Sequence, residues 1–365
     1  PERMIGMAAH DFISTISADE IYVTRAKRSE GAPTVPSRWL LRIDALRDAF
    51  ADFETTWNER EKWDAWARAI DRPETVRPIA PPAPTPPLEA RPNRLSVTRI
   101  EAWLRDPYGL YAERILRLKA LDPLDADPGA AERGTIIHHI LERFIKKYPE
   151  GLPDDAEAQL LEIGRQAFAE FDDRPGLQAL WWPRFERIAG WVVAREKEDR
   201  RNLRKAFAEL RGEIRLDLEK GPFEITAKAD RIDLGQDGTY RILDYKTGSP
   251  PGKKDVESGP SCQLPLEAAI AAAGGFEGLD AGETAALVYW HLSGGVPPGN
   301  ESRLKVNAAL LAETTMERVR RLITAFQDSK MPYEAIPNPS WAPRFNDYEH
   351  LARLREWAVA GREEE

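Results

Sequence analysis

The stretch ITAKADRIDLGQDGTYRILDYKTG, residues 225–248, decides the fold of this chain. Two runs of strand-like alternation flank a Gly-Gln-Asp-Gly break at 235–238, a pattern that predicts a β-hairpin. Counted from the middle of that turn, Asp230 and Asp244 fall at nearly opposite positions of the antiparallel pair. Their Cβ atoms are expected roughly 5–8 Å apart, a separation at which two carboxylates can share one divalent cation.

Lys246 follows Asp244 by two residues, so both side chains are expected on the same face of the strand. A hard cation such as Mg²⁺ takes oxygen ligands, and a water activated there can attack phosphorus while the lysine orients it or stabilises the developing charge. The alternative is a hairpin with an exposed cross-strand charge cluster. The apolar residues around the cluster favour the cation site, because a semi-buried carboxylate pair without a counter-ion is costly.

The rest of the chain surrounds this hairpin with helices. Helical periodicity covers residues 96–118, 133–147, 155–171, 182–210, 263–273 and 307–326, and strand-like alternation covers 213–219, 223–234, 240–246 and 285–292. This order predicts an α/β fold in which a small mixed sheet is flanked by helices and accompanied by a large helical insertion.

A proline-rich stretch marks the expected domain boundary. Residues 72–94 contain eight prolines and are expected to form an extended, semi-rigid linker. Residues 1–71 are expected to be the tail of a larger upstream region, 95–350 the main domain, and 351–365 a C-terminal helix or tail. The chain begins with Pro1, which suggests a fragment or a processed product.

Composition limits the classes of function. The chain is 42% hydrophobic and 31% charged, with a formal net charge of -9, which argues against a protein that simply coats nucleic acid but not against an enzyme that binds DNA locally. Cys262 is the only cysteine, so an intrachain disulfide and an all-cysteine metal site are excluded. No apolar run approaches the roughly 20 residues that a membrane span needs, and we expect a cytoplasmic location.

Four segments carry a family resemblance. Gly134-Thr-Ile-Ile-His138, Asp230, Asp244-Tyr-Lys246-Thr-Gly248 and Gln263, in this order, resemble the motifs of RecB-family nucleases. These belong to the PD-(D/E)XK superfamily, which has a restriction-endonuclease-like core.

The resemblance implies a role for each matching residue. His138, Asp230, Asp244 and the Tyr245 carbonyl would bind Mg²⁺ or Mn²⁺, Lys246 would be the catalytic lysine, and Gln263 would touch DNA. Glu267 departs from the family, because it stands where the Gln-x-x-x-Tyr motif has tyrosine. Judged without the family, a lone histidine beside the apolar stripe of its helix is more often structural than a ligand.

Both ends of the chain narrow the resemblance to the AddB subunit of AddAB helicase–nucleases. Residues 8–39 resemble the end of its helicase-like region, and residues 346–357 resemble its C-terminus. This implies a nuclease that cleaves single-stranded DNA ends, on the 5′-terminated strand, beside an AddA-type helicase–nuclease in double-strand break repair and recombination. The alternative is a catalytically silent subunit that binds DNA and docks on the same partner.

Many AddB proteins hold an iron–sulfur cluster through four cysteines, and this chain has only Cys262. Asp106 stands at the place of the first cluster cysteine, so we expect no cluster. Packing by Trp103, Tyr108 and Tyr111 is expected to fix this region instead.

Further DNA contacts are predicted from basic residues. Trp181-Trp-Pro-Arg-Phe185 leads into a helix with Arg200 and Arg204, and aromatic and basic side chains together suit a single strand. The alternative places those tryptophans in the core. Lys253, in the Gly-Lys-Lys loop after Lys246, could touch a phosphate, although the loop is one residue short of a P-loop.

Overall fold

The computed structural model describes residues 2–49, 60–75, 79–121, 129–171, 174–343 and 345–358. The chain divides into two units, Pro1–Arg77 and Pro78–Glu365. The first unit contains α1 (Glu2–Thr15), β1 (Arg28–Ser29), β2 (Ala32–Pro33), α2 (Arg38–Ala49) and α3 (Arg60–Asp71). No residue of α1 is buried.

The proline-rich stretch belongs in part to the second unit, which corrects the expectation of a linker over 72–94. The Pro82 and Pro84 carbonyls accept hydrogen bonds from the backbone N–H groups of residues 335 and 333, at 3.0 and 2.8 Å. The Arg91 guanidinium donates to three carbonyls at the end of α11 (Ala308–Phe326), those of Phe326, Asp328 and Ser329. An extended proline-rich chain leaves its own carbonyls free, and here they pair with a neighbouring segment. The expected tail at 351–365 is described only as far as residue 358, where it contains α12 (Leu354–Trp357).

The second unit is built on a six-stranded mixed sheet. The strands are β3 (Arg94–Ser96), β4 (Leu203–Leu216), β5 (Phe223–Gly235), β6 (Tyr240–Lys246), β7 (Thr284–His291) and β8 (Asn300–Arg303). Their order is β3-β5-β6-β7-β8, and β4 pairs with β5 along nearly its whole length. The β3–β5 and β6–β7 pairs are parallel and the others are antiparallel.

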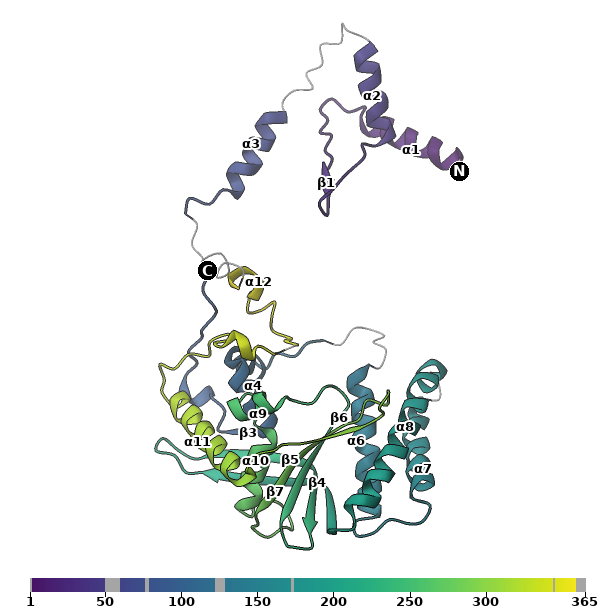
Figure 1. Ribbon diagram of the computed structural model, residues 1–365. Helices are drawn as coiled ribbons and strands as arrows, with labels where there is room; N and C mark the ends of the chain where they lie inside the picture. Colours follow the sequence, from purple (N-terminus) through teal and green to yellow (C-terminus); the bar gives the residue numbers. More distant parts are fainter. Residues whose placement is uncertain are drawn as a thin grey trace. The chain divides into compact units, whose positions relative to one another are not determined.

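Helices cover both faces of this sheet (Figure 1). One face packs against α4 (Val97–Arg105), α10 (Gln263–Ala272) and α11, and the other against α6 (Ala130–Lys147), α7 (Ala156–Phe168) and α8 (Pro175–Asp199). The remaining short helical segments are α5 (Pro107–Leu110), the π-helix Tyr111–Ile115, α9 (Lys253–Ser258) and the 3₁₀ turns Leu88–Ala90, Ala169–Phe171 and Pro339–Trp341. The predicted α/β fold is confirmed, with α6–α8 as the helical insertion before the hairpin.

The β5–β6 hairpin forms where the sequence predicts it. Arg231 pairs with Leu243 and Leu234 with Tyr240, and the next step of this register places Asp230 opposite Asp244. Ile242 packs toward α4, α10 and α11, whereas Leu243 and Tyr245 pack toward α6–α8. Alternation along β6 therefore directs Asp244 toward the α10 side of the sheet.

The predicted helix over 182–210 is wrong at its C-terminal end. The helix α8 stops at Asp199, and β4 begins at Leu203 and pairs with β5 through Leu216. Residues 203–210 are rich in Lys, Arg, Ala, Leu and Glu, which favour helix in isolation. Pairing with β5 and burial against α6–α8 override that propensity.

The alternation of side chains along β5 shifts by one residue beside the β5–β6 turn. Ala227, Ala229 and Ile232 all pack toward α10, although strict alternation would place Ile232 on the opposite face. The slip falls at Asp230, and Glu209, its neighbour on β4, adopts the left-handed conformation with φ 56°. Irregularities of this kind bend a strand and redirect side chains, and they are common next to active sites.

Aromatic packing fixes α4, as the sequence predicts. Trp103 is 2% exposed, and its ring centroid lies 6.3 Å from that of Phe223, 4.8 Å from Phe326 and 6.4 Å from Tyr333. Tyr111 packs against Tyr333 at 6.2 Å. This cluster joins α4 to β5, to α11 and to the segment that pairs with the proline-rich stretch.

Asp106 adds polar contacts to this aromatic cluster. Its Oδ1 accepts a hydrogen bond from the Ile336 N–H at 3.3 Å, and its Oδ2 accepts one from Asn346 Nδ2 at 3.0 Å. Burial raises the pKa of the Asp106 carboxyl. The residue at the expected position of a cluster cysteine thus ties α4 and α5 to the C-terminal segment through hydrogen bonds.

A buried ion network joins α8 to the sheet. Arg231 is fully buried and pairs with Glu196 of α8 and, at 2.6 Å, with Asp233. Arg241 pairs with Asp233 at 2.6 Å and with Asp199 at 2.7 Å. Because each charge has an opposite charge in contact, the network is tolerable in the interior, and loss of one member would leave an uncompensated charge.

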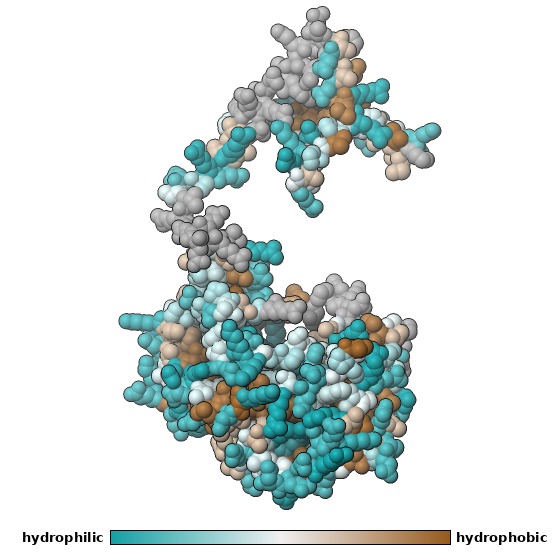
Figure 2. All heavy atoms as spheres, viewed as in Figure 1, coloured by the Kyte–Doolittle hydropathy of each residue, from teal (hydrophilic) through white to brown (hydrophobic). Residues whose placement is uncertain are grey.

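Polar side chains cover most of the visible face of the second unit, with apolar patches between them (Figure 2). One hollow of about 1280 Å³ runs along α10 and α11 and is lined by a mixture of alanines and charged side chains. It contains none of the predicted site residues, so this hollow and the candidate site are separate features.

Candidate active site and metal centre

The catalytic pair predicted on β6 is formed and buried. Asp244 is 1% exposed, and the Lys246 ammonium lies 2.8 Å from its Oδ1 and 2.6 Å from its Oδ2. Gln263, the first residue of α10, donates from Nε2 to the same Oδ1 at 2.8 Å. The Asp244 Oδ2 receives no aligned hydrogen-bond donor among the described residues. This carboxylate is held in place by the Lys246 ammonium and the Gln263 amide.

Asp230 lies on the neighbouring strand and connects the hairpin to α6. Its Oδ2 accepts a hydrogen bond from the Tyr245 N–H at 2.9 Å and lies 3.5 Å from His138 Nδ1. The imidazole also packs edge-on against the Tyr245 ring, at 5.7 Å between centroids. The structure therefore brings the predicted ligands His138 and Asp230 together, while the Tyr245 carbonyl stays a predicted ligand.

Gly134 lets α6 approach the strand that carries Lys246. A Cβ atom at position 134 would lie 3.0 Å from the Thr247 Oγ1, closer than nine in ten real Cβ contacts. His138 follows on the same helix, about one turn further on. The spacing Gly-x-x-x-His thus has a physical reason, since glycine permits the close approach that carries the histidine to Asp230.

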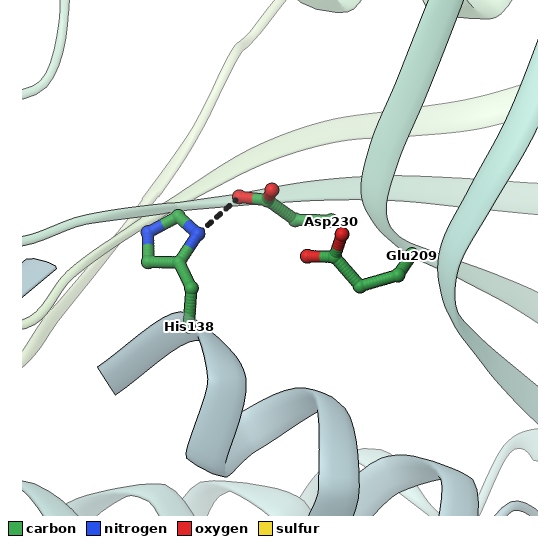
Figure 3. A group of neighbouring side chains, drawn as sticks. All are labelled: His138, Glu209 and Asp230. Atoms are coloured by element: carbon green, nitrogen blue, oxygen red, sulfur yellow. Dashed lines mark ion pairs between the residues drawn. The ribbon is translucent and has the colours of Figure 1, made fainter. Parts of the chain in front are cut away.

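Glu209 is a site residue that the sequence analysis missed. His138, Glu209 and Asp230 form a group in which one potential ligand atom from each lies within 4.8 Å of the others (Figure 3). Glu209 also pairs with Lys228. It was missed because residues 182–210 read as helix, which hides the alignment of Glu209 with Asp230 across β4 and β5.

The carboxyl groups of Asp230 and Asp244 lie close to two basic side chains, His138 and Lys246, and these groups shift one another's pKa values. Burial raises the pKa of Asp244 to about 6, the nearby Asp230 adds to the rise, and Lys246 opposes it. Burial alone would lower the pKa of His138 and of Lys246, yet both are raised, His138 chiefly by Asp230 and Lys246 chiefly by Asp244. Protons therefore compete with any cation for His138 and Asp244 at low pH.

Glu267 replaces the motif tyrosine inside the protein. It is fully buried, it accepts a hydrogen bond from Gln263 Nε2 at 3.2 Å, and burial raises its pKa well above the ordinary value. Asp244 and Asp230 raise it further. The Glu267 carboxyl, one turn along α10, thus supports Gln263, whose amide donates to Asp244.

The three basic residues predicted to contact DNA differ in how far the structure exposes them. The Arg200 side chain is 6% exposed and pairs with Glu196 at 2.8 Å, so the prediction that it touches DNA is wrong. Arg204 is exposed at the start of β4, about 17 Å along the strand from Glu209. Lys253 is exposed on α9 and pairs with Glu257 at 3.5 Å. Both stay predicted contacts.

Comparison with known families agrees with this geometry. The family model described as "PD-(D/E)XK nuclease superfamily" matches residues 94–344. The chain belongs to this superfamily. The matched region contains the sheet, the β5–β6 hairpin and every predicted metal ligand, and members of this superfamily are generally metal-dependent nucleases.

The chain also resembles longer proteins. An uncharacterized protein of Rickettsia bellii is 34% identical over 185 residues, which cover 51% of this chain and 22% of the relative. One of Rickettsia conorii is 28% identical over 261 residues, covering 70% and 30%. The chain thus spans less than a third of the length of these relatives. The solved structure described as "Crystal structure of SSO0001" is 11% identical, with a TM-score of 0.27, over 74% of this chain and 88% of that one.

The residues present fit the divalent cation that PD-(D/E)XK nucleases use. Oxygen atoms of Asp230, Asp244 and Glu209 and an imidazole nitrogen of His138 are ligands suited to Mg²⁺ or Mn²⁺. The close approach of several carboxylates is costly unless a cation compensates them. None of the described helices is long and apolar enough to cross a membrane.

Proposed function

We propose that this PD-(D/E)XK chain is a Mg²⁺- or Mn²⁺-dependent deoxyribonuclease. It hydrolyses phosphodiester bonds of single-stranded DNA ends, on the 5′-terminated strand. The observation that carries the proposal is the buried Asp244 carboxylate, held by Lys246 and Gln263 beside Asp230 and His138.

Each residue has a task in this reaction. His138, Asp230 and Asp244 would hold the cation, with the Tyr245 carbonyl as a further ligand. When bound, the cation supplies Lewis-acid stabilisation of the charge on the phosphate. The Lys246 ammonium, fixed by Asp244, is available to stabilise that charge and to orient the attacking water. Gln263 holds Asp244 and contributes the amide that the family resemblance places near DNA.

The resemblance of both ends of the chain to AddB supports a place in double-strand break repair and recombination. We propose that the chain acts in the cytoplasm beside an AddA-type helicase–nuclease. The length of the relatives is consistent with a C-terminal nuclease region attached to a larger protein.

The experiment that tests the function is cleavage of end-labelled linear single-stranded DNA by the chain, with Asp244→Ala and Lys246→Ala as comparisons. Cleavage is expected to require Mg²⁺ or Mn²⁺ and to vanish in both variants. Labels at either end give the polarity. The assay is repeated with the AddA-type partner if the chain alone is inactive.

Glu267 supports the alternative function, a silent subunit that binds DNA and docks on the partner. It replaces the motif tyrosine with a buried carboxyl, which alters the DNA-facing side of α10. DNA binding without cleavage, both alone and with the partner, would favour this alternative over the nuclease.

A further inference from the structure

Glu209 and Asp230 are aligned across two paired strands. The flanking pairs, Ala208 with Arg231 and Leu210 with Ala229, place the two acids opposite each other. The Glu209 side chain is only 11% exposed, although it carries a carboxylate. A buried acid that faces a second acid is repelled by it and requires a positive charge nearby.

We infer that Glu209 is a metal ligand, which with Asp230 and His138 forms a cation position on the β4–β5–α6 side of the site. This inference rests on the proposed metal-dependent function and extends it by one ligand. The three residues supply two carboxylates and one imidazole, with ligand atoms within 4.8 Å of one another (Figure 3). Among the described residues, this is the group that meets the distance condition for a metal site.

Asp244 is separated from this group by its own partners. Its carboxylate is held by Lys246 and Gln263, on the side of the sheet that faces α10. Glu209 therefore adds a carboxylate ligand on the side of His138. Asp230, between β4 and β6, lies next to both.

Lys228 supplies the competing explanation for Glu209. Its ammonium pairs with Glu209, and its side chain is 59% exposed. If Glu209 served only this ion pair, removal of Lys228 would leave cation binding nearly unchanged. If Glu209 is a ligand, the ammonium competes with the cation, and removal of Lys228 strengthens binding.

The test is a calorimetric titration of the full chain with Mn²⁺, without DNA. Glu209→Gln is expected to weaken Mn²⁺ binding by at least about tenfold, since loss even of a supporting group costs about that much. The matched control is Glu142→Gln, which alters a carboxylate on α6 that pairs with Lys146 rather than with the group. It is expected to stay within about twofold of the wild type.

Lys228→Gln provides a measurement of opposite sign that does not depend on the folding of the Glu209 variant. It is expected to tighten Mn²⁺ binding about threefold, and more than the control Lys146→Gln, which also removes one exposed ammonium. The gain should vanish when Glu209→Gln is also present, because both changes then act on one contact.

The outcomes separate this inference from the proposed function. The inference is overturned if Glu209→Gln binds Mn²⁺ like the wild type while Asp230→Asn loses binding, and the nuclease proposal then stands. It is also overturned if Lys228→Gln and Lys146→Gln behave alike. If the wild-type chain neither binds Mn²⁺ nor cleaves DNA, the proposed function fails, and the inference fails with it.

Discussion

Replacement of Asp244 by asparagine should stabilise the metal-free protein while it destroys the metal site. The rise in the pKa of Asp244 gives the free-energy cost of burying its charge. The rise from 3.8 to about 6 corresponds to about 3 kcal/mol, because each factor of ten in proton affinity is worth about 1.4 kcal/mol. Asparagine resembles the uncharged acid in shape and still meets Gln263, so Asp244→Asn is expected to recover most of that free energy.

The size of the effect depends on pH. The pKa of Asp244 in the folded protein lies above its ordinary value. Between about pH 4 and pH 6 the folded protein therefore keeps a proton that the unfolded chain has lost, and its stability falls as the pH rises through that window. Asp244→Asn should therefore raise the free energy of unfolding by about 3 kcal/mol at pH 8 and by less than about 1 kcal/mol at pH 4.

The assay is urea denaturation in EDTA at both pH values, followed by tryptophan fluorescence. Asp217→Asn, at an acid whose side chain is 84% exposed, serves as the control and should change stability by less than about 1 kcal/mol at either pH. Saturating Mn²⁺ should reverse the order, because only the wild type gains binding free energy. An Asp244→Asn protein that is less stable than the wild type at pH 8 in EDTA would refute the reasoning.

Three further substitutions test the framework of the site. Arg231→Leu removes the buried cation that Glu196 and Asp233 share, leaving only Arg200 and Arg241 to compensate them, and should lower the free energy of unfolding by about 3 kcal/mol in urea denaturation. Trp103→Ala should cost about 3–5 kcal/mol and lower the melting temperature, and an unchanged melting temperature would contradict the packing role. Gly134→Ala should weaken Mn²⁺ binding about tenfold by pushing α6 away from Thr247. Adding Thr247→Ala removes the hydroxyl and should restore most of the binding; no restoration would show that the close contact is not the cause.

The hairpin and its three catalytic side chains could be predicted because short-range rules decide them. A Gly-x-Asp-Gly turn fixes the register, and the register fixes which side chains of β5 and β6 meet. Asp244 and Lys246 follow from the period of a strand alone. The contact of His138 with Asp230 spans more than 90 residues, and only the family resemblance could place it.

The sequence analysis missed Glu209 as a site residue and wrongly predicted that Arg200 contacts DNA. Both lie within residues 182–210, where helix-forming side chains conceal the change from α8 to β4. Read as helix, Arg200 belongs to an exposed basic face and Glu209 to no site. Pairing of β4 with β5 brings Glu209 to Asp230, whereas Arg200 ends α8 and is held there by its ion pair with Glu196, which also binds Arg231 of β5.

Hydrogen bonds of Pro82, Pro84 and Arg91 attach the proline-rich stretch to the second unit. These bonds determine where a pulling force on the chain would enter that unit. Arg91 holds three carbonyls at the end of α11, and Pro82 and Pro84 are bonded to the segment that follows. An extended proline-rich chain can lengthen only a little. A force on the residues before it would therefore be transmitted to α11 and to the Trp103 cluster. Phe223, the first residue of β5, belongs to that cluster, so the force would also reach the start of this strand. Asp230 lies on the same strand, and a pull from upstream would therefore act on the element that positions it.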